Sequence, residues 1–221
     1  MKLAVFGCSW SYGTSQHRKS HKKVEPNWVR CLSKIRPDIS ITSFAHPGTS
    51  LQFSAFLFEQ FAQEFDYTIF QITGSGRLCF WPDQFNFKKH MIQYEDNLIQ
   101  FDDLDSYIFS TNISALLDPE NNSWIFKNKT ADEVNFAHNY FKYMPSDILE
   151  LEYRAIVDKI YNKANLTFWH HGVEQYRSDI FSINQILGDE QYKQYVMDSG
   201  YHFDEDGCKW QANYINDKYL K

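Results

Sequence analysis

Features that would place this chain in a membrane, a secreted scaffold or a zinc-dependent class are scarce in its sequence. Only four of the 221 residues are cysteine, and they form neither a CxxC pair nor the Cys/His spacing of a zinc site. No apolar run approaches the roughly 18 residues of a membrane span, and the apolar part of the N-terminus is too short for a secretory signal. We therefore expect a reduced, cytoplasmic protein that starts at Met1 and holds no metal.

Positive charge is also in short supply. The chain has 22 Lys and Arg residues against 28 Asp and Glu residues, which gives a formal net charge of −6 at pH 7. This balance argues against a general nucleic-acid or anionic-membrane partner, so we expect neither nucleic acid binding nor a membrane span. The basic run at residues 17–23 either attracts an acidic substrate to a nearby site or is a solvated loop.

Hydrophobic and aromatic residues, by contrast, are plentiful. They make up 43% and 18% of the chain, beside 23% charged residues, which is the composition of a globular protein with a ring-rich core. A length of 221 residues favours a single domain over residues 1–221. Between residues 80 and 130 the hydrophobic pattern gives way to Asp, Asn and Gln, so we expect an insertion or lid there, with poorly defined elements.

Short apolar runs alternate with longer stretches of helical periodicity along the rest of the chain. The runs predicted as strands cover residues 2–6, 39–45, 67–73 and 166–170. The stretches predicted as helices cover residues 26–35, 51–65, 131–143, 147–164 and 206–220, with residues 173–196 helical in pieces interrupted at Gly188. This alternation is typical of an α/β fold with three layers, α/β/α, around a central, mainly parallel sheet. Ligands of such sheets bind beyond the carboxyl ends of the strands.

A serine and a histidine lie at the two ends of this pattern. Ser9 directly follows the first predicted strand, and His202 precedes the last predicted helix. A parallel sheet can bring two such residues together as a nucleophile and its general base. Each also has a structural interpretation, Ser9 as a turn or capping residue and His202 as a packed histidine. The serine-rich loop after the first strand is also compatible with the phosphate-binding loop of a flavodoxin-like nucleotide binder.

Three segments together resemble the sequence blocks of the SGNH (GDSL-type) hydrolase superfamily. They are Gly7-Cys8-Ser9-x-x-x-Gly13, Pro47-Gly48-Thr49-Ser50 and a late His202-Phe203 followed by acidic residues and a glycine. The resemblance implies that Ser9 is the nucleophile, that His202 is the general base, and that the Ser9 and Gly48 amides donate to the oxyanion. It also implies a flavodoxin-like sheet, a small-molecule or glycan ester as substrate, and no cofactor. The chain is similar to uncharacterised proteins of tailed bacteriophages and marine bacteria, and a phage-encoded member would act in the host cytoplasm.

The chain departs from the family pattern in two places that matter for catalysis. The third block of the family carries Gly-x-Asn, whereas this chain has Gly74-Ser75-Gly76-Arg77. The Ser75 hydroxyl or the Arg77 guanidinium could replace the missing oxyanion donor, whose loss can cost about 10²–10³ in rate. Arg77 could equally form a surface ion pair. The acid of the family lies three residues before the histidine, where this chain has Ser199, so we expect either Asp198 to complete the triad or a Ser-His dyad.

These residues predict a serine ester hydrolase, either an acyl or an O-acetyl esterase. The alternatives are an acyltransferase with the same residues, a catalytically degenerate SGNH-fold protein that binds a glycan or a protein, and a flavodoxin-like nucleotide binder. Cys8 replaces an aspartate of the first block and is expected to be a small buried side chain. His46 is expected to be packed or capping. The pair His170-His171 is not expected to bind metal, because adjacent side chains of a strand face opposite ways.

Overall fold

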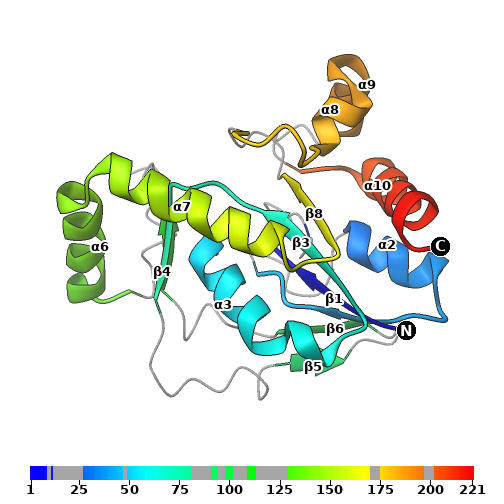
Figure 1. Ribbon diagram of the computed structural model, residues 1–221, viewed down its shortest axis with the longest axis horizontal. Helices are drawn as coiled ribbons and strands as arrows, with labels where there is room; N and C mark the ends of the chain where they lie inside the picture. Colours follow the sequence, from blue (N-terminus) through cyan, green and yellow to red (C-terminus); the bar gives the residue numbers. More distant parts are fainter. Residues whose placement is uncertain are drawn as a thin grey trace.

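The centre of the protein is a six-stranded sheet, shown in Figure 1. The computed structural model describes residues 1–8, 11, 27–46, 49–80, 91–93, 98–101, 109–112, 129–169, 175–196 and 202–221. In their order across the sheet, the strands are β5 (Met91–Gln93), β6 (Leu98–Phe101), β2 (Ser40–Ser43), β1 (Lys2–Phe6), β3 (Tyr67–Ile72) and β8 (Leu166–Trp169). Every neighbouring pair is parallel except β5 and β6, which are antiparallel. The predicted α/β class with a mainly parallel sheet is confirmed.

Two pairs of helices cover the two faces of this sheet (Figure 1). The four helices are α2 (Trp28–Ile35), α3 (Leu51–Phe61), α7 (Ser146–Tyr161) and α10 (Glu205–Tyr219). The buried residues of α2 and α10 share one hydrophobic cluster with Leu3 and Val5 of β1. Those of α3 and α7 share another with Ala4 and Phe6. Because successive side chains of a strand point to opposite faces, β1 contributes to both cores in alternation, and three layers result.

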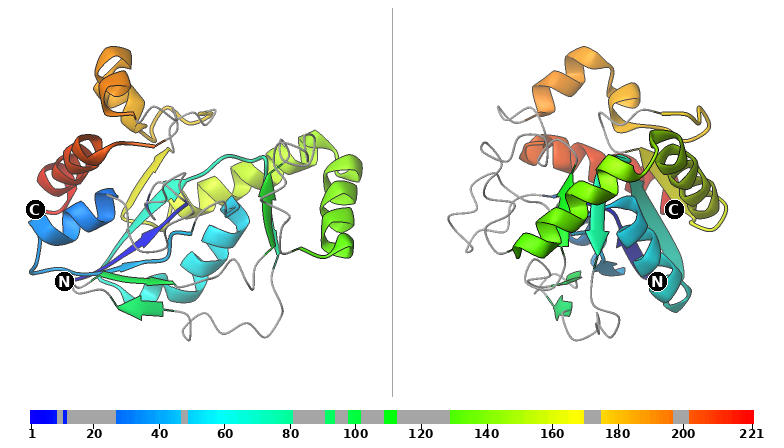
Figure 2. Two further views of the ribbon diagram at one scale, coloured as in Figure 1. Left: turned by 180° about the vertical axis from the view of Figure 1, so that it is seen from behind. Right: turned by 90° about the vertical axis from the view of Figure 1, so that its left-hand side faces the viewer.

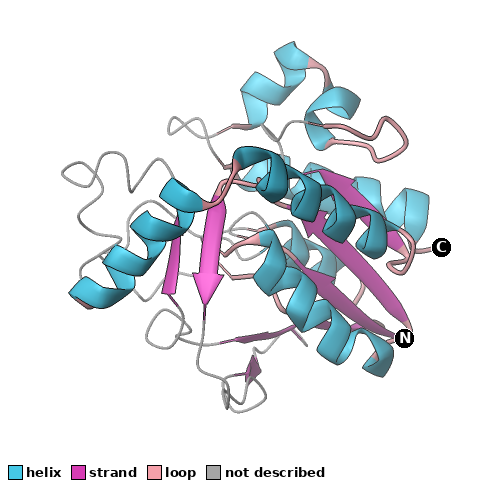
Figure 3. Cartoon of the chain, turned by 60° about the vertical axis from the view of Figure 1, so that its left-hand side comes forward, coloured by secondary structure: helices cyan, strands magenta, loops and turns pink. Residues whose placement is uncertain are grey.

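The remaining elements lie outside these layers. They are η1 (Ala62–Glu64), β4 (Arg77–Phe80), β7 (Phe109–Asn112), α6 (Ala131–Tyr143), α8 (Ile183–Leu187) and α9 (Asp189–Tyr195). β4 and β7 form a two-stranded antiparallel sheet, and α6 packs beside it, as Figure 3 shows. α8 and α9 stand above α10 in the left-hand view of Figure 2. No helix in the described ranges is both long and apolar enough to cross a membrane.

Side-chain caps fix the starts of the two helices that matter most for the site. The Ser50 hydroxyl accepts a hydrogen bond from the Phe53 amide at the start of α3. The Asp204 carboxylate accepts one from the Gly207 amide at the start of α10. Each cap satisfies an amide that has no partner within its own helix. The loops that precede these two helices therefore enter them at fixed positions.

Local signals also explain the interruption of the predicted helical stretch 173–196. Gly188 has a φ of 72° and separates α8 from α9. Glycine adopts this left-handed conformation at little cost, whereas other residues do not. The predicted interruption is confirmed, although the described residues before Ser182 are not helical.

The chain reverses its direction across the sheet at β1. β2 pairs with one edge of β1, and β3 pairs with the other. The crossovers through α2 and α3 therefore run in opposite directions, and the loops after β1 and β3 separate. In open parallel sheets, ligands bind at such a switch point, outside the carboxyl ends of the strands. Gly7 and Thr73 directly follow these two strands, so two of the loops predicted to carry the site begin at this edge of the sheet.

The segment between residues 80 and 130 differs in part from its prediction. β5 and β6 extend the main sheet beyond β2, and β7 pairs with β4. The prediction of poorly defined elements is wrong for these strands. β6 and β7 pair with the distant strands β2 and β4, which local patterning does not reveal, and β5 pairs with β6. The ranges 81–90, 94–97, 102–108 and 113–128 lie outside the described residues. A role as a lid, and a single domain carrying this insertion, remain predictions.

Candidate active site

The chain turns back directly after β1. The Ser11 amide donates to the Cys8 carbonyl at 3.0 Å, which closes a short turn at the carboxyl end of the strand. Cys8 is fully buried, as predicted. Ser9, the predicted nucleophile, lies outside the described residues, but it is covalently bonded to Cys8 and so follows the end of β1 by three residues. At Gly7, an added Cβ would lie only 3.0 Å from the Cβ of Gln71, so strand β3 approaches this turn closely.

A buried hydrogen-bonded anchor holds this turn from two sides. The Ser11 hydroxyl donates to Oε1 of Gln71 on β3 at 2.6 Å. Nε1 of Trp28, the first residue of α2, donates to the Ser11 hydroxyl at 3.2 Å. The three residues are at most 1% exposed. Buried polar groups of this kind fix one geometry, because any displacement leaves a donor or acceptor without a partner.

The sequence analysis missed this anchor. A signal for it exists, since Gln71 is an amide side chain near the end of an otherwise apolar strand, YTIFQI. A polar residue in a strand that is buried on both faces requires a hydrogen-bond partner. The identity of that partner could not be read from the sequence, because Ser11 is 60 residues away from Gln71.

The loop between β2 and α3 is tied to the same point. The Ser54 hydroxyl donates to the Gly7 carbonyl at 3.2 Å, and the His46 amide donates to it at 3.4 Å. The Thr49 hydroxyl donates to the His46 carbonyl at 2.8 Å, and this hydrogen bond links the two residues that flank positions 47 and 48. Gly48, the predicted oxyanion donor, lies outside the described residues. His46 is 4% exposed, which agrees with the packed interpretation.

Strand β4 contacts this loop from a third direction. Nη1 of Arg77 donates to the Thr49 carbonyl at 3.5 Å, and the Ser50 amide donates to Sγ of Cys79 at 3.0 Å. Among the described residues, no carboxylate forms an ion pair with Arg77, so the ion-pair alternative finds no support there. Ser75 is exposed in the loop between β3 and β4.

The end of β3 is fixed from the α7 side. The Tyr153 hydroxyl donates to the Thr73 carbonyl at 2.8 Å. Burial raises the pKa of Tyr153 well above its ordinary value, so the hydroxyl stays protonated and remains a donor across the physiological pH range.

His202, the predicted base, precedes α10 and is partly exposed. The Asp204 amide donates to the Tyr195 carbonyl at 2.8 Å, and Phe203 forms a β-bridge with Val196, so the backbone here is tied to the end of α9. Gly207 packs closely beneath Phe203, because an added Cβ would lie 2.9 Å from its Cγ. Asp198 lies outside the described residues, as do His170 and His171.

The first and last parts of the chain meet in one core. Cys8, which precedes Ser9, and Phe203, which follows His202, are both buried in the hydrophobic cluster between the sheet, α2 and α10. They are 0% and 3% exposed. The backbones that carry the predicted nucleophile and the predicted base are therefore anchored in the same cluster. Among the described residues, no group of His, Cys, Asp or Glu side chains could hold a metal ion.

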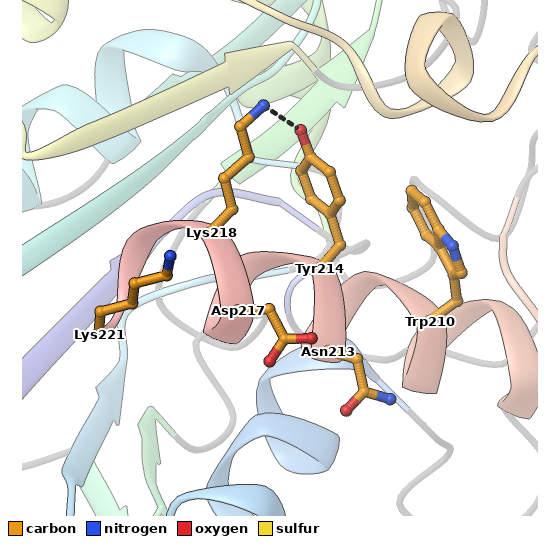
Figure 4. Close-up of a pocket in the computed structure, with 6 residues that line it drawn as sticks. All are labelled: Trp210, Asn213, Tyr214, Asp217, Lys218 and Lys221. Atoms are coloured by element: carbon orange, nitrogen blue, oxygen red, sulfur yellow. Dashed lines mark hydrogen bonds between the residues drawn. The ribbon is translucent and has the colours of Figure 1, made fainter.

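A pocket of about 430 Å³ lies elsewhere, along the C-terminal half of α10 (Figure 4). Its described lining residues are Trp210, Asn213, Tyr214, Asp217, Lys218 and Lys221. The Trp210 and Tyr214 rings stack on each other with centroids 5.4 Å apart, and Nζ of Lys218 donates to the Tyr214 hydroxyl at 2.9 Å. The lining residues begin at Trp210, about 9 Å along the helix from Asp204, and continue to the C-terminus, away from the start of α10.

Comparison with known proteins gives structural likenesses only. No family model and no curated protein matches the sequence. The structure is similar to a lipase/acylhydrolase from Enterococcus faecalis, with 10% identity, 97% of this chain and 92% of that chain covered, and a TM-score of 0.41. It is also similar to the lipase Lip_vut3 from a goat rumen metagenome, with 14% identity, 99% and 98% coverage, and a TM-score of 0.46.

A third similar structure is a member of the lipolytic protein G-D-S-L family from Veillonella parvula DSM 2008. The identity is 12%, the alignment covers 100% of this chain and 98% of that chain, and the TM-score is 0.39. Its name is that of the family which the sequence blocks resemble. With TM-scores below 0.5, these likenesses carry no conclusion about the chemistry of this chain.

Proposed function

We propose that this protein is a serine ester hydrolase in which Ser9 is the nucleophile and His202 is its general base. The observation that carries the proposal is the shared burial of Cys8 and Phe203 in one cluster. These residues are the immediate sequence neighbours of Ser9 and His202. The backbone neighbours of a serine and a histidine from opposite ends of the chain are thus buried in one cluster, which supports the proposal.

The reaction then follows the chemistry of these two side chains. His202 accepts the hydroxyl proton of Ser9 as Oγ attacks the ester carbonyl, and the carbonyl oxygen becomes an oxyanion. Collapse of this intermediate breaks the bond to the alcohol oxygen, which takes the proton from His202. Water then attacks the acyl-serine with His202 again as the base, and the acid and free Ser9 are released. No cofactor takes part in these steps.

The oxyanion requires donors that are in place before the charge develops. We assign this role to the Ser9 and Gly48 amides. Ser75 and Arg77 are the polar residues of the third block, where the family carries its Asn. The hydrogen bonds from Ser54 and His46 to Gly7 support the assignment, because they join the loop that contains Gly48 to the end of β1. Asp198 is the proposed acid, and the substrate is a small-molecule or glycan ester.

The test is hydrolysis of p-nitrophenyl acetate and butyrate by the wild type, Ser9→Ala and His202→Ala. Two matched controls are Ser40→Ala and His138→Ala, which remove an exposed serine and an exposed histidine. A fluorophosphonate probe and mass spectrometry locate the reactive serine. We expect turnover in the wild type and both controls, its loss in both site variants, and the label on Ser9. A folded wild type with neither turnover nor label would overturn the proposal in favour of a binding protein.

A further variant, Asp198→Asn, distinguishes the triad from the dyad. If Asp198 orients His202, its replacement lowers kcat by orders of magnitude while the fluorophosphonate still maps to Ser9, because the amide cannot stabilise the imidazolium. If the dyad acts alone, kcat stays within about twofold of the wild type. Measuring kcat from pH 5 to pH 9 separates this effect from a loss of folded protein.

A further inference from the structure

One peptide group of the loop between β2 and α3 is bound at both of its polar ends by strand β4. The carbonyl of Thr49 and the amide of Ser50 belong to the same peptide unit. Nη1 of Arg77 donates to that carbonyl at 3.5 Å, and the amide donates to Sγ of Cys79 at 3.0 Å. A trans peptide presents its carbonyl and its amide in opposite directions. Arg77 and Cys79 are two residues apart on one strand, so their side chains lie on the same face, about 6.6 Å apart along it.

The amide of Ser50 is in a place where a partner is needed. Ser50 is fully buried, and its hydroxyl and carbonyl are already used, since they accept from the amides of Phe53 and Ser54. A buried amide without an acceptor costs free energy comparable to a lost hydrogen bond. Cys79 is 8% exposed and supplies the acceptor that this amide has. Removing the Cys79 thiol would therefore leave the Ser50 amide without this acceptor.

The remainder of the loop is closed on itself. The Thr49 hydroxyl donates to the His46 carbonyl across residues 47 and 48, and the His46 amide donates to Gly7. Gly48 thus lies in a four-residue segment whose first residue is tied to the end of β1 and whose last peptide is held by β4. The Thr49–Ser50 peptide follows the Gly48 amide by only two peptide units, so holding this peptide restricts the path of the chain next to Gly48.

We propose that Arg77 and Cys79 are positioning residues, which orient the loop of Gly48 so that its amide faces the oxyanion. This inference rests on the proposed hydrolase function. It gives Arg77 a different task from the missing third-block Asn, since its Nη1 is bound to the loop backbone. In this proposal the Gly48 amide binds the oxyanion, and β4 orients the loop that contains this amide. The third block supplies no side-chain amide.

The test uses Arg77→Met, which removes the donor, and Cys79→Ala, which removes the acceptor. The conservative variants are Arg77→Lys, which keeps a donor, and Cys79→Ser, which keeps an acceptor. Cys31→Ala is the matched control, since Cys31 lies on α2, on the other side of the sheet. We expect kcat for p-nitrophenyl acetate to fall on the order of tenfold in Arg77→Met and Cys79→Ala with KM nearly constant, below the 10²–10³ of losing a donor outright. Cys79→Ser should recover most of the loss.

A second readout tests the contact without relying on catalysis. Amide hydrogen exchange at Ser50 should accelerate at least tenfold in Cys79→Ala, while amides in β1 and α2 keep their wild-type rates. A wild-type kcat in both Arg77→Met and Cys79→Ala would overturn the positioning role. If the wild type itself neither turns over nor reacts with fluorophosphonate, the hydrolase function fails, and an unchanged Ser50 exchange rate in Cys79→Ala would then separately remove the contact.

Discussion

Two sets of hydrogen-bonded side chains at opposite edges of the parallel sheet differ in charge and burial. At the carboxyl edge, Ser11, Gln71 and Thr49 are uncharged and are 0%, 1% and 0% exposed. At the amino edge, beside a neutral bond between Thr68 and Asn165, the pair Arg36 and Asp38 is charged and more accessible. Arg36 forms a two-point ion pair with Asp38 there, and its Nη1 donates to the Leu220 carbonyl at 2.6 Å.

The buried neutral set fixes the positions of its side chains, whereas the exposed ion pair adds stability without fixing a single geometry. Exposed ion pairs contribute about 0–1 kcal/mol, because water and mobile ions compete with them. Buried neutral hydrogen bonds also contribute little in net terms, but breaking one of the pair leaves an orphaned group at a cost of about 1–3 kcal/mol. Displacing the set Ser11, Gln71 and Thr49 therefore costs more free energy than displacing the Arg36–Asp38 pair, and fixed positions of this kind are what a catalytic site would require.

Among these residues, we expect the largest loss of unfolding free energy from Ser11→Ala, at the carboxyl edge. The change removes the donor to Gln71 Oε1 and the acceptor of Trp28 Nε1, and each orphaned group costs about 1–3 kcal/mol of unfolding free energy. Urea unfolding followed by circular dichroism measures the loss. The fluorophosphonate labelling rate of Ser9 should fall as well. An unfolding midpoint equal to that of Ser40→Ala would show that the buried anchor carries no stability.

A smaller effect is expected for Gly207→Ala, on the His202 side of the same edge. The new Cβ would lie 2.7 Å from the Cβ of Tyr195 and 2.9 Å from Cγ of Phe203, so backbone or ring must move. Overpacking of this kind costs about 1–3 kcal/mol, which exceeds the gain of about 0.5–1 kcal/mol from helix propensity.

The matched control for this change is Gly74→Ala, where an added Cβ meets nothing within 4 Å. Thermal unfolding of the two variants checks the prediction. If both proteins unfold at the same temperature, the packing beneath Phe203 is looser than described. We also expect kcat to fall in Gly207→Ala, because the change displaces the backbone next to His202.

The smallest effect belongs to the amino edge and depends on pH. Hydrogen bonds from Arg36 hold the pKa of Asp38 at about 2, below its ordinary 3.8. A carboxylate with a depressed folded-state pKa stabilises the fold above its unfolded pKa, and this contribution is lost as the pH falls from about 4 toward 2. The wild type should therefore lose stability more steeply over this window than Asp38→Asn. If the wild type and Asp38→Asn lose the same free energy of unfolding between pH 5 and pH 3, the stabilising role of the Arg36–Asp38 pair is contradicted.

Hydrophobic patterning was sufficient to predict the framework that carries the site. The predicted strand at residues 2–6 and helix at 131–143 coincide with β1 and α6, because both are local patterns with clear ends. The Ser11–Gln71 anchor was missed, since it depends on the register between β1 and β3, where Val5 lies opposite Ile69. Strand β6 was missed for a similar reason, since it pairs with the distant β2, whereas β5 pairs with β6, the next strand in the chain. The roles of Ser9, Gly48 and Asp198 remain predictions, because these residues lie outside the described ranges.

The shared core of Cys8 and Phe203 has a consequence for the order in which the proposed site is assembled during synthesis. The chain that carries Ser9 is made first, and Phe203 is added after about 190 further residues. Until Phe203 and α10 join the cluster, that face of β1 is covered by α2 but not by α10, and the proposed nucleophile has no base. Under the proposed mechanism, a chain that ends at residue 201 has no esterase turnover, and adding residues 202–221 as a separate peptide tests whether turnover returns.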